Sequence, residues 1–355
     1  MARTFRVIDT GIRDGRRQIA FDQALIDAHR AGSVPDTIRF LRFPPTALIG
    51  RHQALSREVD AQYCQTHDVG IARRITGGGA IYFDEGQLGW ELVFDRKTLG
   101  IGTLAELTRE ICEAAAAGLS RLGVTARYRP RNDIEVDGRK ISGTGGFFDQ
   151  ETLFYQGTVL VDLNPAEMTA ALKVPQTKLA KRSLDSAAQR VVTLKELLGV
   201  APTIEAIQQA LLAGFAQRLC VTPIPGAITP LEEELAARYF EEEIGTDAFV
   251  AEIDDPPAAD DVRSASHTGA GGTITVYAQL AGAQRDRIDR VLITGDFFVT
   301  PPRTVFDLEA ALRQVPVAEA GAVIDRFFER AEVGLLSVSP SDFRSAVEAA
   351  VGAAH

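Results

Sequence analysis

The dipeptide Asp137-Gly138 constrains the fold of this chain more than any other feature of its sequence. It separates two short runs of strand-forming residues, and a type I′ turn requires positive φ at both of its central positions. The resulting hairpin register pairs Val136 with Arg139, Glu135 with Lys140, Ile134 with Ile141, and Asp133 with Ser142. We therefore expect Lys140 to share a face with Asp133, Glu135 and Ser142, opposite Ile134 and Ile141.

Strand-like and helix-like patterns alternate up to about residue 220. Strand-like runs lie at 37–41, 47–49, 89–94 and 153–161. Helical periodicity is clearest at 104–119 and 204–215, where we expect the apolar stripes to face the core. The predicted fold class is α+β, with a mixed or antiparallel sheet flanked by helices.

The length of the chain predicts more than one domain. Its 355 residues, 45% of them hydrophobic and 24% charged, exceed the usual size of one compact domain. Three prolines at 223, 225 and 230 precede an acidic helix-like stretch at 231–244, expected to be a solvated face, and 254–272 is typical of linker and loop. We expect a larger domain at 1–225, a helical linker at 226–262 and a smaller α+β domain at 263–355. The smaller domain should contain strands at 272–280 and 288–298 and helices near 305–312, 318–328 and 341–351.

Composition argues against several classes of protein. Cys64, Cys112 and Cys220 are spaced neither as a disulfide framework nor as a zinc site, and no cleavable apolar segment precedes Phe5, so we expect a cytoplasmic protein. No run approaches the roughly 18 apolar residues of a membrane span. A net charge of −10 opposes nonspecific attraction to nucleic acid or anionic lipid. The histidines show no metal-ligand spacing.

A triglycine, Gly77 to Gly79, is the second motif of interest. Without Cβ atoms, this backbone can take positive φ and let a ligand approach its N–H donors, although a structural turn is the alternative. The triplet fits neither the P-loop nor the dinucleotide fingerprint. Arg73 and Arg74 precede it, and guanidinium groups suit carboxylate or phosphate, unless the pair is a solvated strand end.

Lys140 completes the set of candidate functional residues. An ammonium held among polar neighbours can neutralise charge on a carboxylate or phosphate. From the hairpin alone, an exposed Glu135–Lys140 ion pair worth well under about 1 kcal/mol is the favoured interpretation. Together, however, the hairpin and the triglycine indicate handling of an activated, negatively charged acyl group.

Ordered blocks of sequence surround these motifs. They are 48–53 with Glu58, 73–80, 131–143, 157–161, and a run comprising 172–174, 178–179, Ser183 and 192–194. In this order they resemble the lipoate-protein ligase family, within the biotin and lipoate ligase superfamily. Segments 271–274, 293–298 and 308–312 are similar to the family's accessory domain.

The resemblance implies an enzyme that joins lipoate or octanoate to ATP, forms lipoyl-AMP and releases pyrophosphate. The acyl group then passes to one lysine of an acceptor, which is a lipoyl domain, a glycine-cleavage-H-like protein or a lipoate-binding protein. Mg²⁺ is expected beside ATP, and neither nucleic acid nor membrane is an expected partner. The accessory domain, hinged through 223–261, is expected to swing after adenylation.

The resemblance also assigns roles residue by residue. Lys140 matches the motif lysine, implied to contact the acyl carbonyl and the α-phosphate. The implied acyl and adenylate site comprises Arg74, Thr76, Gly77, Gly78, Gly79, Ala80, Asn132, Asp133, Ser142, Gly143, Gly157 and Thr158. Arg51, Arg73, Phe83 and Asp84 are implied supporting residues. The sequence does not identify the magnesium ligand, for which Asp84 and Asp133 are candidates.

The chain departs from the family pattern after the glycines. Phe83 replaces a histidine, Gln87-Leu88 replaces an asparagine region, and Trp90 follows, so we expect a more apolar or differently shaped acyl pocket. Each buried methylene contributes about 0.8 kcal/mol, which leaves the choice between lipoate and octanoate open. Segment 87–92 also resembles ligases of sulfur-oxidising bacteria, which serve a dedicated lipoate-binding acceptor.

Two alternatives stay open. Octanoyltransferases of related fold use a cysteine that follows the motif lysine, whereas this chain has no cysteine between Cys112 and Cys220. Cys112 lies in an amphipathic pattern and is expected to be a small buried hydrophobe. The other alternative is a noncatalytic lipoyl-binding scaffold, which would have no need for all the motif residues together. The acceptor and the oligomeric state are left open.

Overall fold

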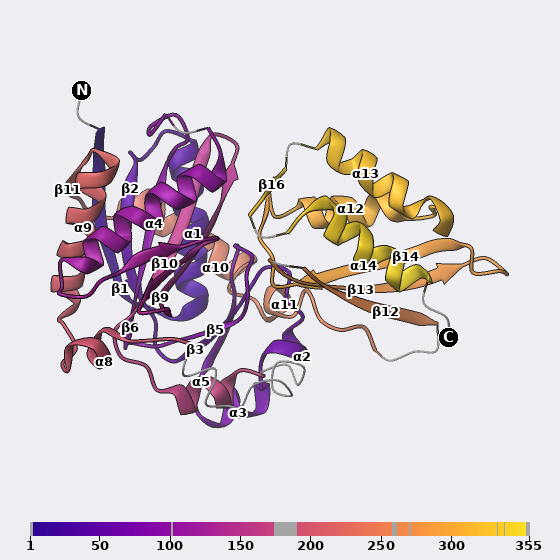
Figure 1. Ribbon diagram of the computed structural model, residues 1–355, viewed down its shortest axis with the longest axis horizontal. Helices are drawn as coiled ribbons and strands as arrows, with labels where there is room; N and C mark the ends of the chain where they lie inside the picture. Colours follow the sequence, from indigo (N-terminus) through magenta and orange to yellow (C-terminus); the bar gives the residue numbers. More distant parts are fainter. Residues whose placement is uncertain are drawn as a thin grey trace.

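The computed structural model describes residues 3–100, 102–173, 190–257, 261–269, 271–331, 333–336 and 338–352. The chain forms a larger part and a smaller part that lie side by side (Figure 1). The block 178–179 and Ser183, used in the family resemblance, lies outside the described residues. None of the helices within these ranges is long and apolar enough to cross a membrane.

An eight-stranded mixed sheet is the framework of the larger part. Its strand order is β11 (Val221–Pro225), β1 (Arg3–Ile12), β2 (Thr37–Arg42), β6 (Gln87–Asp95), β10 (Thr152–Leu160), β9 (Arg139–Asp149), β8 (Asp133–Val136) and β7 (Arg127–Arg129). β1 runs parallel to β11 and β2, and the remaining neighbours are antiparallel. The predicted fold class is confirmed.

Helices cover both faces of this sheet. α4 (Leu104–Ser120) and α9 (Ile204–Leu219) cover one face, with α8 (Leu194–Leu198) beside them, while α1 (Gly15–Arg30) covers the other. Thr103 and Thr203 cap α4 and α9 by accepting backbone N–H bonds, which explains where the two predicted helices begin. The helices approach closely because Gly214 has no side chain: an added Cβ would lie 2.3 Å from the Ala114 carbonyl oxygen.

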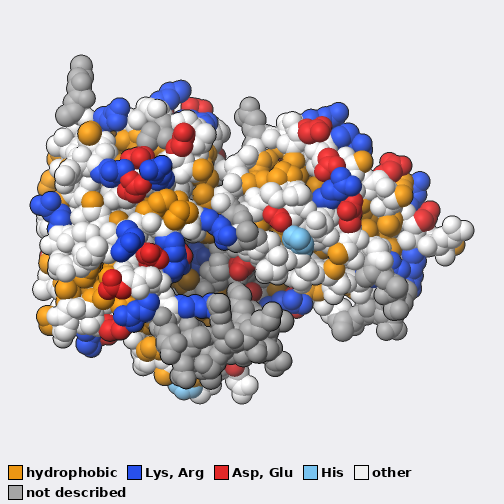
Figure 2. Space-filling model, viewed as in Figure 1, with side chains coloured by type: hydrophobic (Ala, Val, Ile, Leu, Met, Phe, Trp, Pro, Cys, Tyr) orange, Lys and Arg blue, Asp and Glu red, His pale blue; other side chains and the backbone are white. Residues whose placement is uncertain are grey.

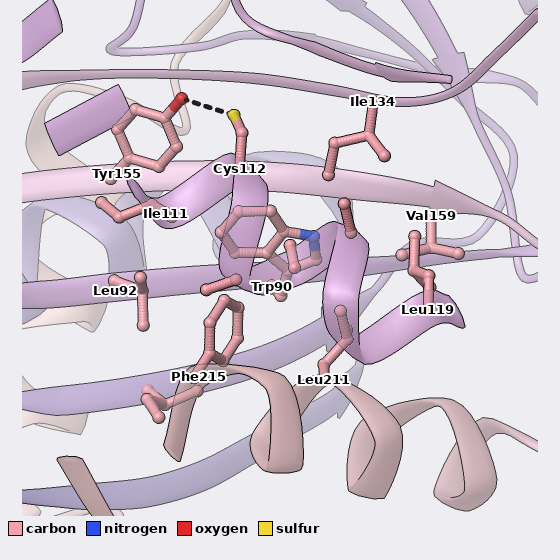
Figure 3. Packing of buried hydrophobic residues seen from close by; sticks show 14 of the residues in the cluster. Trp90, Leu92, Ile111, Cys112, Leu119, Ile134, Tyr155, Val159, Leu211 and Phe215 are labelled. Atoms are coloured by element: carbon pink, nitrogen blue, oxygen red, sulfur yellow. Dashed lines mark hydrogen bonds between the residues drawn. The ribbon is translucent and has the colours of Figure 1, made fainter. Parts of the chain in front are cut away.

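Trp90 is the centre of the core between the sheet and these helices. Its indole packs against Phe215 of α9, with ring centroids 5.4 Å apart, and Leu119 and Leu211 surround it (Figure 3). The same cluster contains the Cys112 thiol, which lies 3.4 Å from the Tyr155 hydroxyl. Cys112 is therefore a buried core residue, as its helical position predicts.

The β8–β9 hairpin confirms the predicted turn but corrects its register. Asp137 and Gly138 have φ of 50° and 79°, as a type I′ turn requires. Glu135 pairs with Lys140 as predicted, but a bulge follows, so Ile134 pairs with Ser142 and Asp133 with Gly143. The predicted pairings of Ile134 with Ile141 and of Asp133 with Ser142 are therefore wrong, because the bulge inserts one residue into β9. Ser142 shares the buried face of Ile134 instead of the face of Lys140.

A second, smaller sheet lies beside the main one. It has the order β4 (Gly70–Arg73), β3 (Thr46–Ile49) and β5 (Ile81–Phe83). The short helices α2 (Leu55–Glu58), α3 (Ala61–Thr66) and α5 (Pro165–Ala171) accompany it. Cys64 and Tyr82 belong to its apolar core. The triglycine is thus the connection between two strands of this sheet, β4 and β5.

The acidic stretch after β11 packs on the larger part. It forms α10 (Pro230–Glu242) and α11 (Asp247–Val250), and α10 lies along α1. Glu232 closes a capping box with Thr229 and pairs with Arg6 at 2.5 Å. Glu232 is fully buried, so the expectation of a wholly solvated acidic face is wrong at this residue.

The smaller part is a three-stranded antiparallel sheet covered by helices. The sheet has the order β12 (Val262–Gly269), β13 (Gly272–Ala281) and β14 (Arg287–Gly295). α12 (Thr304–Leu312), the 3₁₀ helix Val317–Glu319, α13 (Ala320–Arg330) and α14 (Pro340–Gly352) accompany it, and β15 (Val299–Thr300) pairs with β16 (Gly334–Leu335). The expectation of linker and loop across 254–272 is wrong for β12, whose alternating half-buried residues pair with β13.

Candidate functional site

A cavity of about 330 Å³ lies between the face of the main sheet and the small sheet. Its floor follows the period-two alternation of strands. Gln87, Gly89 and Glu91 of β6 border it together with their partners on β10, Leu160, Thr158 and Gln156. Gly143 and Gly145 of β9 extend the floor without side chains. Because the floor lacks bulk there, the cavity runs across three strands.

The opposite wall comes from the glycine connection and its surroundings. Residues 77–83, Leu48 of β3 and Phe298 of the smaller part border the cavity, and α1 contributes Ile19 and Asp22. Thr76 does not reach the wall, but its hydroxyl accepts a hydrogen bond of 2.8 Å from Gln156 in the floor. The space-filling view shows a hollow in the larger part, close to the seam with the smaller part, with Lys and Arg side chains beside it (Figure 2).

Lys140 borders the cavity at the β8–β9 end. Its Nζ lies 2.8 Å from Asp133 Oδ1, while Arg129 Nη2 contacts the other oxygen at 2.7 Å. Burial alone would raise the pKa of Asp133, but Lys140 and Arg129 outweigh it and hold this pKa below its usual value. The lysine reaches Asp133 by passing over Gly143, where an added Cβ would lie 2.6 Å from Nζ. The absence of a side chain at Gly143 therefore leaves room for the lysine to reach Asp133.

Asn132 and Thr144 border the cavity and are joined to each other by hydrogen bonds. The Asn132 side-chain amide donates to the Thr144 carbonyl, and the Thr144 backbone N–H donates to the Asn132 carbonyl at 2.9 Å. The Thr144 hydroxyl also donates to the Asn132 carbonyl at 2.8 Å and contacts Tyr155 at 2.5 Å. These bonds fix Asn132 at the edge of the cavity, which Lys140 and Thr158 also border.

The two predicted arginines have different roles. Arg74 borders the cavity, and its guanidinium donates to the carbonyls of Leu48, Gly77 and Gly79, so it shapes the glycine connection. Burial lowers the pKa of Arg74 to about 10. Arg73 lies behind the wall, and its guanidinium donates to a set of backbone carbonyls: Gly50, Arg51, Gln53, Phe249, Val250 and Ile253. Arg73 therefore ties the chain after α11 to the larger part.

The space beside the triglycine is filled by the smaller part. The Gly78 N–H donates to the Phe297 carbonyl at 3.0 Å, and an added Cβ on Gly77 would lie 2.1 Å from that oxygen. The Phe298 ring lies against Gly78 and Gly145, where added Cβ atoms would lie 2.5 and 2.2 Å from it. The bare backbone that the sequence assigns to a ligand thus accommodates a segment more than 200 residues away in the chain.

The place of Trp90 relative to the pocket was hard to predict because it depends on Gly157 in the neighbouring strand. They pair directly across β10 and β6, and an added Cβ on Gly157 would lie 2.2 Å from the Trp90 ring. The indole belongs to the core on the other face of the sheet. The Trp90 side chain therefore belongs to the core, while Trp90 and Gly157 are both among the residues that border the cavity.

The structure brings most of the predicted residues together. Those bordering the cavity are Arg74, Gly77, Gly78, Gly79, Ala80, Phe83, Asn132, Lys140, Gly143, Gly157 and Thr158. Thr76 and Asp133 stand directly behind, through their bonds to Gln156 and Lys140. Ser142, Arg51, Arg73 and Asp84 do not border it. The sequence reasoning missed Asp22, Glu91, Gln156 and Phe298, of which Glu91 carried a signal: a charge inside an apolar strand.

The described residues include no cluster of three His, Cys, Asp or Glu side chains arranged for a metal ion. Asp84 accepts the Gly86 N–H at 2.9 Å, and burial raises its pKa. Asp133 is engaged by Lys140 and Arg129. Neither candidate magnesium ligand borders the cavity.

None of the three thiols borders the cavity, but the Cys112 Sγ lies 3.3 Å from the hydroxyl oxygen of Thr144, which does. No cysteine stands among its described lining residues. Cys64 and Cys112 are buried, and burial raises the pKa of each to about 11, while Cys220 is exposed at the end of α9. A thiol of raised pKa is a poor nucleophile because the thiolate is the reactive form.

Comparisons of sequence agree with this geometry. Residues 14–216, more than half of the chain, match the family model of the lipoyl protein ligase A/B catalytic domain. The octanoyltransferase LipM of Symbiobacterium thermophilum is 31% identical over 270 residues, which cover 70% of this chain and 98% of that protein. Lipoate-protein ligase A subunit 1 of Thermoplasma acidophilum is 29% identical over 244 residues, which cover 66% and 91%.

Solved structures extend the comparison. A structure of the bipartite lipoate protein ligase of Thermoplasma acidophilum and its E2 lipoyl domain has a TM-score of 0.64 at 26% identity, covering 72% of this chain and all of that chain. A lipoate-protein ligase A bound with ATP gives 0.61 at 26%, covering 70% and 98%. Plasmodium falciparum LipL1, at 14% identity, shares the fold over 97% of this chain and 98% of its own, with a TM-score of 0.70. The cavity, its lysine and these likenesses agree, and the chain belongs to the lipoate-protein ligase and octanoyltransferase family.

Proposed function

We propose that the protein is an ATP-dependent lipoate-protein ligase. The observation that carries this proposal is Lys140, whose ammonium stands at one end of a largely apolar cavity that has no thiol among its described lining residues. The apolar wall suits a medium-length acyl chain, and the ammonium suits the carboxylate at its head. A similar chain of known structure binds ATP, in keeping with a nucleotide at this site.

The first step activates the acid. A carboxylate oxygen of lipoate attacks the α-phosphorus of ATP, the bond to pyrophosphate breaks, and lipoyl-AMP forms. Lys140 lowers the barrier by holding the carboxylate against the α-phosphate and by neutralising part of their negative charge. Asp133 keeps the ammonium in place, since its carboxylate holds Nζ at 2.8 Å. Asn132 borders the same cavity, where its amide can contact the adenylate.

The second step transfers the acyl group. The neutral amine of an acceptor lysine attacks the acyl carbon, the bond to AMP breaks, and the amine releases its proton as the amide forms. Lys140 again stabilises negative charge at the acyl oxygen, while AMP leaves as a weakly basic phosphate. The nucleophile belongs to the acceptor, so the protein needs no nucleophile of its own in this scheme.

Mg²⁺ would enter this reaction with ATP. Its role when bound is to offset the charge of the phosphates. Because Asp84 and Asp133 do not border the cavity, we assign the ion no ligand from the protein.

The acceptor follows from the same proposal. We expect a small lipoyl domain, because the related ligase of Thermoplasma acidophilum has been described with its E2 lipoyl domain. A glycine-cleavage-H-like protein and a dedicated lipoate-binding protein are the other acceptors to be tried.

An ATP-independent octanoyltransferase is the second candidate function. It is favoured by the 31% identity to LipM of Symbiobacterium thermophilum. In that reaction an acyl group would pass from a carrier thioester to the acceptor without an adenylate. The positions of the three cysteines oppose an acyl-thioester form of this protein, because both buried thiols have raised pKa values and Cys220 lies outside the cavity wall.

Acyl-dependent exchange of labelled pyrophosphate into ATP tests the proposal. The protein should catalyse exchange only with lipoate or octanoate present. The Lys140→Ala variant should lose at least about 100-fold of this rate, the typical effect of removing one group that stabilises transition-state charge. Its circular dichroism and melting temperature should match those of the parent, since the lysine is partly exposed. Full exchange activity in Lys140→Ala would remove the lysine from its role, and no exchange in the parent would contradict ATP-dependent ligation.

A further inference from the structure

A short chain of buried polar side chains leads from the core to Asn132 at the cavity edge. The Thr144 hydroxyl donates to the Asn132 carbonyl at 2.8 Å and lies 2.5 Å from the Tyr155 hydroxyl. The Cys112 thiol lies 3.3 Å from Thr144 Oγ1 and 3.4 Å from the Tyr155 hydroxyl (Figure 3). Thr144, Tyr155 and Cys112 are all buried. The proposed reaction steps use none of these three groups.

The direction of the hydrogen bonds follows from the number of hydrogens. A threonine hydroxyl has one hydrogen and a backbone carbonyl only accepts, so Thr144 directs its hydrogen to Asn132. Tyr155 must therefore donate to Thr144, and the Cys112 thiol can donate to either hydroxyl oxygen. Burial raises the pKa of Tyr155 well above its usual value, which keeps this donor protonated. The bonds thus run in one direction, from α4 and β10 through β9 to Asn132.

Asn132 depends on this support because it lies in the turn between β7 and β8. Its carbonyl accepts both the N–H and the hydroxyl of Thr144, and its side-chain amide donates to the Thr144 carbonyl. The preceding carbonyl, that of Arg131, accepts the Tyr128 hydroxyl at 3.0 Å. Thr144 therefore holds both the backbone and the side chain of Asn132.

The same bonds determine which amide atom Asn132 offers to a ligand. Because a carbonyl cannot donate, the amide nitrogen must face Thr144, and the amide oxygen Oδ1 points away from it. Oδ1 accepts no hydrogen bond from any residue in the described part of the chain, and Asn132 borders the cavity. An oxygen of this kind pairs only with a donor. Ionised phosphate and carboxylate oxygens carry no hydrogen, whereas the ribose hydroxyls and the adenine amino group of ATP do.

We propose that Thr144 is a positioning residue, which presents Asn132 Oδ1 to a hydroxyl or amino donor of the nucleoside of ATP. The inference rests on the proposed function and divides the nucleotide within that site. Lys140 meets the α-phosphate, and Asn132 meets the nucleoside. Loss of the Thr144 hydroxyl should disturb Asn132 more than the lysine, because Asp133 holds Nζ by its own contact at 2.8 Å.

The kinetics of acyl-dependent pyrophosphate exchange test the role of Thr144. Thr144→Val keeps the size of the side chain and deletes the donor, so the KM for ATP should rise about tenfold while the KM for lipoate stays close to that of the parent. Thr144→Ser keeps the hydroxyl and should restore the KM for ATP to within about twofold of the parent. A threonine needed only for folding would lower the melting temperature without raising the KM of one substrate alone.

Thr46→Val is the matched control. Thr46 is also a buried strand residue, its hydroxyl donates to the Pro44 carbonyl at 2.7 Å, and it does not border the cavity. Its KM for ATP should equal that of the parent. An unchanged KM for ATP in folded Thr144→Val, or the same increase in Thr46→Val, overturns the inference.

Three nucleotides identify the donor in the parent protein. Relative to ATP, 2′-deoxy-ATP and 3′-deoxy-ATP each lack one hydroxyl, and purine riboside triphosphate lacks the amino group. One of them should show a KM about tenfold above that of ATP, and this difference should disappear in Asn132→Ala because the acceptor is gone.

Equal KM values for all four nucleotides in the parent overturn the inference even if Thr144→Val does not fold. Exchange of pyrophosphate in the parent would then still support the ligase. Absence of acyl-dependent exchange in the parent would overturn the ligase and this inference together.

Discussion

The lysine of the cavity owes its position to a glycine. Lys140 crosses Gly143 to reach Asp133, and the bulge after Lys140 brings Gly143 opposite that aspartate. In the regular register predicted from the turn, Ser142 would occupy this place, and its side chain would obstruct the lysine. With the inserted residue, the Lys140 ammonium is held in position at the cavity; without it, Lys140 would form an ordinary exposed ion pair.

Gly143→Ala tests this arrangement. The added Cβ would lie 2.6 Å from the lysine Nζ and 2.8 Å from its Cε, so the flexible lysine should move aside while the strand persists. We expect pyrophosphate exchange to fall about tenfold or more, because small displacements of a catalytic group are expensive. The melting temperature should change little. Gly102→Ala is the matched control, as its Cβ meets no atom within 4 Å; equal activities of the two variants would contradict this role of Gly143.

At the scale of elements, the sequence predicts the features that depend on local pattern, but it does not predict those that depend on contacts between distant segments. The stripes of α4 and α9, the strands β2, β6 and β10, and the turn at Asp137-Gly138 were all predictable, since periodicity and turn chemistry are local. The bulge in β9 depends on what packs beneath the hairpin. The strand β12 was missed because its burial alternates only between exposed and half-buried.

The candidate site was predictable to a similar extent. The motif residues Arg74, Asn132 and Lys140 border the cavity. Phe298 could not be assigned, because its contact with Gly78 joins segments more than 200 residues apart. Asp22 was missed for the same reason, because it lies on α1 and meets Arg39 of β2 only in the folded chain.

The contact between α12 and β14 predicts a pH effect on stability. The Glu309 carboxylate accepts the Ile293 N–H at 2.7 Å, and burial raises its pKa from 4.5 to about 7. The folded state then holds a proton that the unfolded chain releases above its lower pKa. The associated stability is fully present below pH 4.5 and is lost as the pH rises through 7.

Thermal unfolding of Glu309→Gln against the parent measures this effect. The amide does not titrate, so the melting temperature of the variant minus that of the parent should increase between pH 5 and pH 8. A constant difference across this range would show that the folded and unfolded states bind the proton equally well.

At the scale of the molecule, the smaller part closes the cavity of the larger one. The Phe297 carbonyl accepts the Gly78 N–H, and the Gly295 N–H donates to the His52 carbonyl at 2.9 Å. The Thr300 hydroxyl accepts the Phe148 N–H and donates to the Phe148 carbonyl. α10 and α11 stay on the larger part through Arg6–Glu232 and the carbonyls that Arg73 binds. We therefore propose that a hinge lies after Ile253, in a shorter segment than the 223–261 expected from the sequence.

We predict that the smaller part moves during the reaction. Phosphates cannot use the Gly78 N–H while Phe297 accepts it, so nucleotide binding at this loop requires the docked segment to leave. Small-angle scattering should show a change in molecular dimensions when ATP and lipoate are added together. Superimposable curves with and without both ligands would contradict the movement.

The most direct measurement is the intact mass of candidate acceptors. Lipoyl domains, glycine-cleavage-H-like proteins and lipoate-binding proteins are incubated with this protein, Mg²⁺ and either lipoate or octanoate, each with and without ATP. We expect one acceptor to gain a lipoyl group only when ATP is present, because the acid must first become an adenylate. Transfer from an octanoyl-carrier thioester without ATP, with no gain from the free acids, would contradict the ligase and identify an acyltransferase.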